Sequence, residues 1–144
     1  VAASIYAACR MGNIPRTLDE VGIHSRTGRK EIGRTYREVA KALKLRVSPS
    51  SPHEYIPRFC STLDLPNETE MRAMNILTQA EKMELTAGRG PTSIRAASVY
   101  LASLITNNAR TQKEVSKAAG ITEVSIRNRY KELCVHLQIN PDDY

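Results

Sequence analysis

Four side chains near the carboxyl end of the chain have the types and the spacing needed to read DNA bases. At about 100° per residue, Val124, Arg127, Asn128 and Lys131 gather on one side of a helix. Arginine can bond guanine O6 and N7 in bidentate fashion, asparagine can bond adenine, and valine can touch the thymine methyl group. We therefore expect this face to enter a major groove, where its first three residues read bases and Lys131 holds a phosphate. The alternative is a solvated helix face with one exposed valine.

The elements that must position this face form a helix-turn-helix over residues 111–138. A short helix over 111–119 is followed by Gly120 and Ile121, and Thr122 then caps the second helix. We expect Lys113 and Thr122 to hold further phosphates. The opposite side of the second helix carries a core-facing stripe within an arc of about 60°, formed by Ile126, Tyr130, Leu133 and Leu137.

An internal repeat extends this organisation to the amino-terminal part of the chain. Shifting the sequence by 94 residues aligns 2–45 with 96–139 without a gap, and 14 of the 44 positions are identical. Duplication explains this better than chance. The second copy has residues 51–90 ahead of its Ala-Ala-Ser motif and the first copy has nothing there. We therefore expect the back part of one repeat followed by one whole repeat.

The first copy has a different outer face at the matching positions. Val124, Arg127, Asn128 and Lys131 are replaced there by Lys30, Gly33, Arg34 and Arg37. This face has charge but little to read a base edge, so we expect Lys30, Arg34 and Arg37 to contact phosphates or an acidic protein surface without sequence preference. The alternative is a solvated basic face. The second repeat would then read sequence while the first holds the backbone.

Helix start signals and the absence of an alternating β-branched run predict an all-α protein. Residues 1–46 are expected to form the first, partial repeat, 47–51 a linker, and 52–140 the complete second repeat. Capping motifs are expected at Thr17, Ser51, Asn67 and Thr111. The expected helices lie near 1–11, 17–24, 28–44, 52–63, 67–86, 92–106, 111–119 and 122–138.

Composition narrows the function classes. The 144 residues carry a net charge of +6, with basic segments over 1–50 and 87–144 around an acidic one, which suits a polyanion held at two places. No apolar run reaches the roughly 20 residues of a membrane-spanning helix. The three cysteines and three histidines form no ligand or nucleophile spacing, so we expect no metal, no cofactor and no enzyme.

Several motifs now resemble the core domain of general transcription factor IIB, and most of all its archaeal version. They are Ala7-Ala8-Cys9-Arg10, Ile14-Pro15-Arg16-Thr17, Lys30-Glu31-Ile32-Gly33-Arg34, Arg110-Thr111-Gln112-Lys113-Glu114-Val115 and the run from Val124 to Leu133. The resemblance implies two cyclin-like repeats of five helices each, the first incomplete here. It implies binding to the complex of TATA-binding protein with promoter DNA, and reading of the upstream B recognition element by the second repeat.

The resemblance also implies roles for single residues. Val124 and Arg127 match the family's base-reading pair, and Lys30 and Arg34 match basic residues that face DNA and partners. Arg10, with Arg16, would lie near the TATA-binding protein and DNA. The zinc ribbon and the segment that engages RNA polymerase are absent from the chain, so polymerase recruitment would depend mainly on that missing region.

Two rivals share the same fold prediction. A cyclin-like protein-interaction adaptor would have the helices without sequence-specific DNA binding, and a related factor would serve another polymerase. No small-molecule substrate and no membrane partner are expected. The archaeal likeness favours a cytoplasmic, nucleoid-associated protein, and the eukaryotic version would be nuclear.

Overall fold

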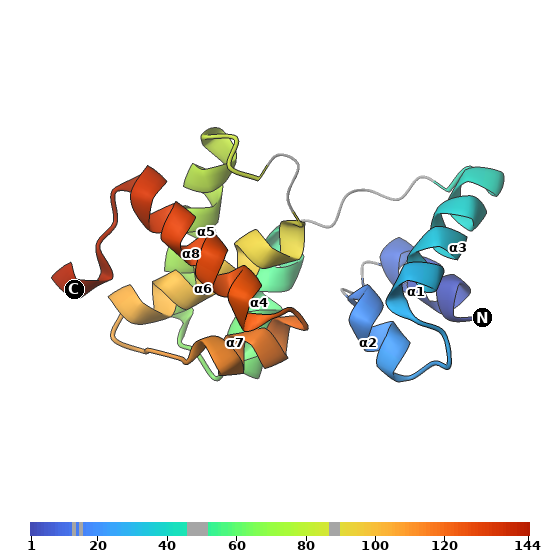
Figure 1. Ribbon diagram of the computed structural model, residues 1–144, viewed down its shortest axis with the longest axis horizontal. Coiled ribbons are helices and arrows are strands. Elements are labelled where there is room, and N and C mark those ends of the chain that lie inside the picture. The colour runs from blue at the N-terminus through green and yellow to red at the C-terminus, as the bar shows by residue number, and fades with distance from the viewer. Residues whose placement is uncertain (13, 15, 46–51, 87–89) are drawn as a thin grey trace. The chain divides into compact units, whose positions relative to one another are not determined.

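The computed structural model describes all residues except 13, 15, 46–51 and 87–89, so the predicted linker and the Ser51 cap lie outside the described residues. Over the described part of the chain it contains eight α-helices, one short 3₁₀ helix and no strand (Figure 1). This confirms the all-α prediction. The chain divides into two compact units, Val1–Glu54 and Tyr55–Tyr144. None of the described helices is long and apolar enough to cross a membrane.

Unit 1 is built from three helices around a small core. These are α1 (Ala2–Met11), α2 (Leu18–Ile23) and α3 (Arg29–Ala42), and each packs against the other two. The buried core consists of Ala2, Ala3, Tyr6, Val21 and Ile32, with Leu18 and Tyr36 packed against it. Several large apolar side chains of unit 1 stay exposed, among them Ile5, Met11, Ile23 and Leu43.

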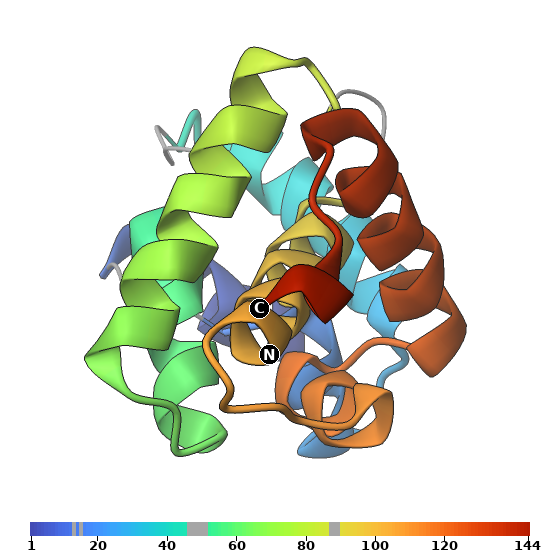
Figure 2. The same cartoon turned by 90° about the vertical axis from the view of Figure 1, so that its left-hand side faces the viewer.

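Unit 2 surrounds one central helix. Its elements are α4 (Pro52–Thr62) from Tyr55 onward, α5 (Asn67–Lys82), α6 (Pro91–Ile105), α7 (Gln112–Ala119), α8 (Glu123–Leu137) and η1 (Pro141–Asp143). Helix α6 packs against α5, α7, α8 and η1, and Figure 2 shows it between α5 and α8. Its buried residues lie on all sides, as expected for a helix enclosed by others. The sequence did not predict η1.

The duplication predicted from sequence is visible in matching aromatic pairs. The rings of Tyr6 and Tyr36 meet edge to face, with centroids 4.9 Å apart at 85°. Tyr100 and Tyr130, each 94 residues further on, meet at 5.0 Å and 78°. Edge-to-face contact is a favoured geometry for aromatic rings. Helices α1 to α3 therefore repeat the packing of α6 to α8.

Most predicted helix starts are confirmed, and one is wrong. Thr17 and Thr111 both form complete capping boxes, and Thr122 caps α8. The expected cap at Asn67 is wrong, because α5 begins at Asn67 itself and Pro66 is the N-cap residue. Pro66 already has the extended backbone that a cap position needs, so the helix starts one residue earlier.

The expected helix over 67–86 also ends too late, because α5 stops at Lys82. Glu84 adopts a left-handed backbone with φ 56°, and the Leu85 amide donates to the Ala80 carbonyl at 3.0 Å. This Schellman-type turn returns the chain toward the helix and buries Leu85. No glycine marks the turn, which is why helix-stop signals in the sequence do not reveal it.

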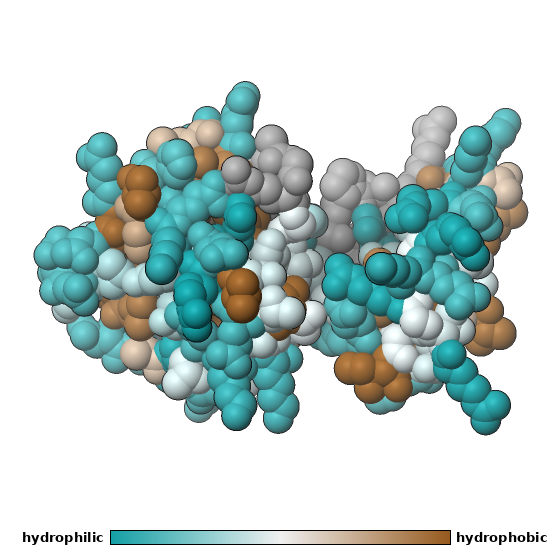
Figure 3. Space-filling view, viewed as in Figure 1, coloured by the Kyte–Doolittle hydropathy of each residue, from teal (hydrophilic) through white to brown (hydrophobic). Residues whose placement is uncertain are grey.

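Hydrophilic side chains cover most of the face seen in Figure 3, with separate apolar patches on both units. Scattered apolar side chains are normal on protein surfaces.

Candidate nucleic-acid interface

The α7–α8 pair starts from a fixed helix end. The Thr111 hydroxyl accepts from the Glu114 amide at 3.2 Å, and Glu114 Oε2 accepts from the Thr111 amide at 2.7 Å. The Thr111 amide first, and then the Thr111 hydroxyl, which donates to the same Glu114 oxygen at 2.7 Å, hold the pKa of Glu114 below its ordinary value. The capping box sets the direction in which the first side chains of α7 leave the helix.

The turn between α7 and α8 depends on Gly120. Its φ of 65° and ψ of 37° lie in the left-handed region, where a side chain is disfavoured. The Gly120 amide donates to the Ser116 carbonyl, and the Ser116 hydroxyl donates to the Ile121 carbonyl at 2.6 Å. The predicted three-residue helix-turn-helix connection is therefore present, with Gly120, Ile121 and Thr122 between the two helices.

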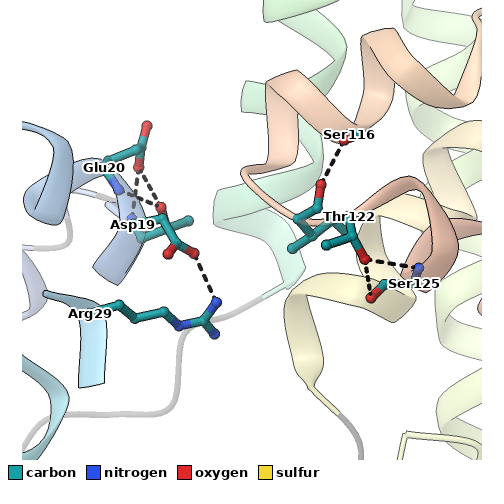
Figure 4. A network of polar contacts seen from close by, with 8 residues as sticks. Asp19, Glu20, Arg29, Ser116, Thr122 and Ser125 are labelled. Carbon is teal, nitrogen blue, oxygen red and sulfur yellow. Dashed lines mark hydrogen bonds and ion pairs between the residues drawn. The ribbon is translucent and has the colours of Figure 1, made fainter.

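Thr122 holds the start of α8. Its Oγ1 accepts from the Ser125 amide at 3.2 Å and lies 2.9 Å from the Ser125 hydroxyl (Figure 4). Thr122 was predicted as a phosphate contact, and its hydroxyl is already engaged in capping. Any role in DNA contact would share that oxygen with the helix end.

The exposed face of α8 carries the four predicted residues together. Val124 is 60% exposed, and Arg127, Asn128 and Lys131 are exposed beside it. Ile126 and Leu133 on the opposite face are fully buried. This arrangement follows the helical spacing, and it leaves the outer face of α8 available to a groove.

One residue of α7 that the sequence did not single out contacts this face of α8. Arg127 Nε donates to Gln112 Oε1 at 3.2 Å, across the two helices. Gln112 is the first residue of α7, directly after the Thr111 cap. The sequence signal for this pair lies in the repeat. The positions that match Gln112 and Arg127 in the first copy are Leu18 and Gly33, so both residues of the pair are replaced together.

The basic residues of unit 1 surround one hollow. A shallow depression of about 640 Å³ on α2 and α3 is lined by Leu18, Arg29, Lys30, Glu31, Gly33, Arg34 and Arg37. The three predicted phosphate contacts are all exposed on this surface. Arg29 Nη1 is held 2.9 Å from Asp19 Oδ2, as Figure 4 shows. Leu18 packs closely over Gly33, since an added Cβ would lie 3.3 Å from Leu18 Cδ1.

Arg10 and Arg16 do not line this depression. Arg10 lies half-buried in the last turn of α1, and Arg16 is exposed just before the Thr17 cap. In unit 2 the equivalent of Arg16 is Arg110, whose Nε and Nη2 donate to the Leu63 and Asp64 carbonyls at 2.9 Å each. That arginine secures the end of α4, which is a structural use of the same repeat position.

Groups for metal or redox chemistry are not brought together among the described residues. No cluster of three or more His, Cys, Asp or Glu side chains with metal-binding geometry occurs there. The three cysteines are free thiols, and burial, followed by the charge of Glu70, raises the pKa of Cys60 to about 12. Burial first, then the neighbouring Cys134, raises the pKa of Tyr130 to about 12, so its hydroxyl stays neutral.

The fold and this surface define a class of protein in which two copies of one cyclin-like helical repeat each carry a helix-turn-helix. The chain matches the transcription factor TFIIB repeat over residues 1–42 and 46–136, and it belongs to this family. The resemblance drawn from the sequence motifs is thus confirmed. The family is one of transcription factors rather than enzymes.

Archaeal relatives agree over almost the whole chain. The transcription initiation factor IIB of Methanothrix thermoacetophila is 56% identical over 138 residues, which are 96% of this chain and 41% of that protein. The factor of Archaeoglobus fulgidus is 55% identical over 139 residues, 96% of this chain and 43% of its own length. The factor of Methanocaldococcus jannaschii is 56% identical over 140 residues, which are 97% of this chain and 21% of that protein. The chain spans about two fifths of the first two relatives.

Proposed function

We propose that this chain is the DNA-binding core of a general transcription initiation factor. It binds the complex of TATA-binding protein with promoter DNA, and α8 reads the upstream B recognition element in the major groove. The observation that carries this proposal is the exposed face of α8, where Val124, Arg127 and Asn128 lie together opposite the fully buried Ile126 and Leu133. The names of the archaeal relatives support the general role.

The two units divide the work. Base contacts by α8 supply sequence preference, and Lys113, Lys131 and the Thr122 end of α8 position the helix on phosphates. The cations around the depression of unit 1 hold the DNA backbone without reading it. Arg10 and Arg16 contribute at the boundary with the TATA-binding protein. Because reading is asymmetric, the bound factor has one orientation, which sets the direction of transcription and helps the whole factor to recruit RNA polymerase.

A gel-shift titration tests the proposal. The DNA carries a TATA box with or without an intact upstream purine-rich element, and TATA-binding protein is present or omitted. Free DNA should bind weakly, because phosphate contacts supply most of the affinity and few bases are read. Arg127→Ala should weaken binding by about 1–3 kcal/mol to DNA with the intact element. On DNA with a scrambled element, binding should weaken only by the effect of the lost positive charge.

Arg129→Ala is the matched control. It removes the same charge from the same helix, and Arg129 pairs with Glu132 at 2.5 Å rather than with Gln112. It should weaken binding equally on both DNAs. If the parent protein is folded by circular dichroism and still ignores the complex at low salt, the proposal fails. A cyclin-like adaptor function without sequence-specific DNA binding then takes its place.

A further inference from the structure

We infer that Gln112 is a positioning residue for base reading, because it orients the Arg127 guanidinium toward guanine. The inference rests on the proposed function of α8. Gln112 touches Arg127 from the other helix of the pair, with Oε1 accepting from Nε at 3.2 Å. It therefore acts on the base through Arg127.

The chemistry of the guanidinium explains what this contact does. Arginine has five N–H donors in a planar fork, and a guanine takes two of them at O6 and N7. When the Nε–H is bonded to Gln112, the edge that carries Nη1 and Nη2 remains for the base. A long side chain that is already held in one orientation loses less conformational freedom on binding. Gln112 thus favours guanine over bases that cannot accept both bonds.

The backbone of Gln112 is itself fixed. It is the first residue of α7, and the Thr111–Glu114 capping box closes around that helix start. Gln112 is also half-buried, whereas Arg127 is exposed. The support therefore comes from the more buried of the two partners.

The first repeat carries an independent observation. Shifting by 94 residues places Leu18 on Gln112 and Gly33 on Arg127, so both members of the pair are absent together. Leu18 instead covers Gly33, with its Cδ1 3.3 Å from where a Cβ would lie. The copy without a base-reading arginine thus has no amide to orient one.

A neutral amide suits this position next to DNA. A glutamate would accept from Nε more strongly, since it is charged, but it would also repel the phosphates. Gln112→Glu should therefore keep the preference for guanine while lowering affinity for every DNA sequence. Gln112→Ala should lower the preference itself.

The first test needs no DNA. In the parent, ¹⁵N NMR should show an Arg127 Nε–H with slower solvent exchange and less motion than that of Arg34, an exposed arginine for which we find no partner among the described residues. Gln112→Ala should abolish the difference, and Gln112→Glu should retain it. Gln79→Ala makes the same substitution on α5, where Gln79 bonds Asn75 at 2.6 Å, and should change nothing at Arg127. An Arg127 Nε as mobile in the parent as in Gln112→Ala overturns the inference.

The second test uses TATA-binding protein and DNAs in which each upstream base pair is varied. The base position whose preference for guanine is lost in Arg127→Ala is the one that this arginine contacts. Placing 7-deazaguanine at that position then removes the N7 acceptor. At this position Gln112→Ala should reduce the preference for guanine by about 2- to 10-fold. Thermal unfolding should match the parent, and other base positions should keep their preferences.

The outcomes separate the two claims. If Arg127→Ala alters no base preference, or the parent does not bind the complex, the proposed function fails and this inference fails with it. If Arg127→Ala removes the preference and Gln112→Ala does not, only the role of Gln112 is overturned. A uniform loss across all base positions would likewise assign Gln112 a merely structural role.

Discussion

The two helix-turn-helix pairs of this chain share their buried faces and differ in their exposed ones. Ile32 of α3 and Ile126 of α8 are both fully buried, and each copy has the same edge-to-face tyrosine pair. On the outer face, Arg127 is replaced by Gly33 and Gln112 by Leu18. Packing constrains the inner positions, since an interior at crystal-like density tolerates little change in shape. The outer positions were therefore the ones available for different chemistry.

The charges at the helix junctions are reversed between the copies. In unit 1, Asp19 on α2 pairs with Arg29 at the start of α3. At the matching positions of unit 2, Lys113 lies on α7 and Glu123 at the start of α8. Glu123 suits a helix N-terminus, and Lys113 is exposed. The junction cation of unit 1 therefore lies in an ion pair with Asp19, whereas that of unit 2 is Lys113, which we propose as a phosphate contact.

The largest expected effect comes from breaking the shared inner face. Ile32→Ala and Ile126→Ala each remove a fully buried side chain, which should cost about 2–5 kcal/mol. Unit 1 has the smaller core, so Ile32→Ala should unfold it while unit 2 stays folded. Urea titration followed by NMR signals of each unit measures this. Ile5→Ala, at an exposed position of α1, is the control. If both units stay folded to the same urea concentration after their core substitutions, the predicted effect of core size is contradicted.

Removing the outer charges of unit 1 should have the next largest effect. Replacing Lys30, Arg34 and Arg37 together by alanine should weaken binding to the protein–DNA complex for every upstream sequence. The slope of log affinity against log salt should become shallower by about 0.9 for each lost phosphate contact. Arg127→Ala should instead change sequence preference. A sequence-dependent loss in the unit 1 variant would break the proposed division between the copies.

The turns should respond differently to a side chain. Gly120→Ala places a Cβ at φ 65° and should destabilise unit 2 by about 1–2 kcal/mol. The equivalent residue of unit 1 is Arg26, which is not in the left-handed region. Arg26→Ala should therefore stay within about 0.5 kcal/mol of the parent. Thermal unfolding of each variant, followed by signals from its own unit, checks the contrast.

The smallest expected effect is a pH dependence at the α7 capping box. The pKa of Glu114 is lower in the folded protein than its ordinary value of 4.5, so folding is stabilised above that value. This contribution is lost as pH falls through the lowered folded pKa. Glu114→Gln should therefore destabilise unit 2 at neutral pH, and the difference from the parent should narrow in acid. Unfolding curves across this range measure it, and a pH-independent difference would exclude the carboxylate as its source.

Local signals in the sequence determined most of the helices and their starts. Thr17, Thr111 and Thr122 each combine a hydroxyl with the right following residues, so the capping bonds form within four residues and need no distant partner. The helical spacing of residues 124–131 likewise determined the exposed face of α8. The repeat then predicted that α1 to α3 would pack as α6 to α8 do.

The tertiary structure decided where several helices end. Left-handed backbone conformations occur within two residues of a helix end at five positions, none of them a glycine: Lys44, Asp64, Glu84, Asn107 and Gln138. In each case the next residue donates its amide to a carbonyl five residues back. Leu65 and Leu85 are two such residues, and each joins the core of unit 2. The apolar contact offsets the cost of positive φ, and that contact exists only once the helices are packed.

The contact between Gln112 and Arg127 was decided in the same way. The two residues are 15 positions apart on different helices, and their 3.2 Å hydrogen bond depends on the angle set by the Gly120 turn. The sequence by itself determined which side chains lie on each helix face, because helical geometry relates residues three and four apart. Which faces meet was decided by the packing of α7 and α8 on α6, because only there do residues from different helices come within bonding distance.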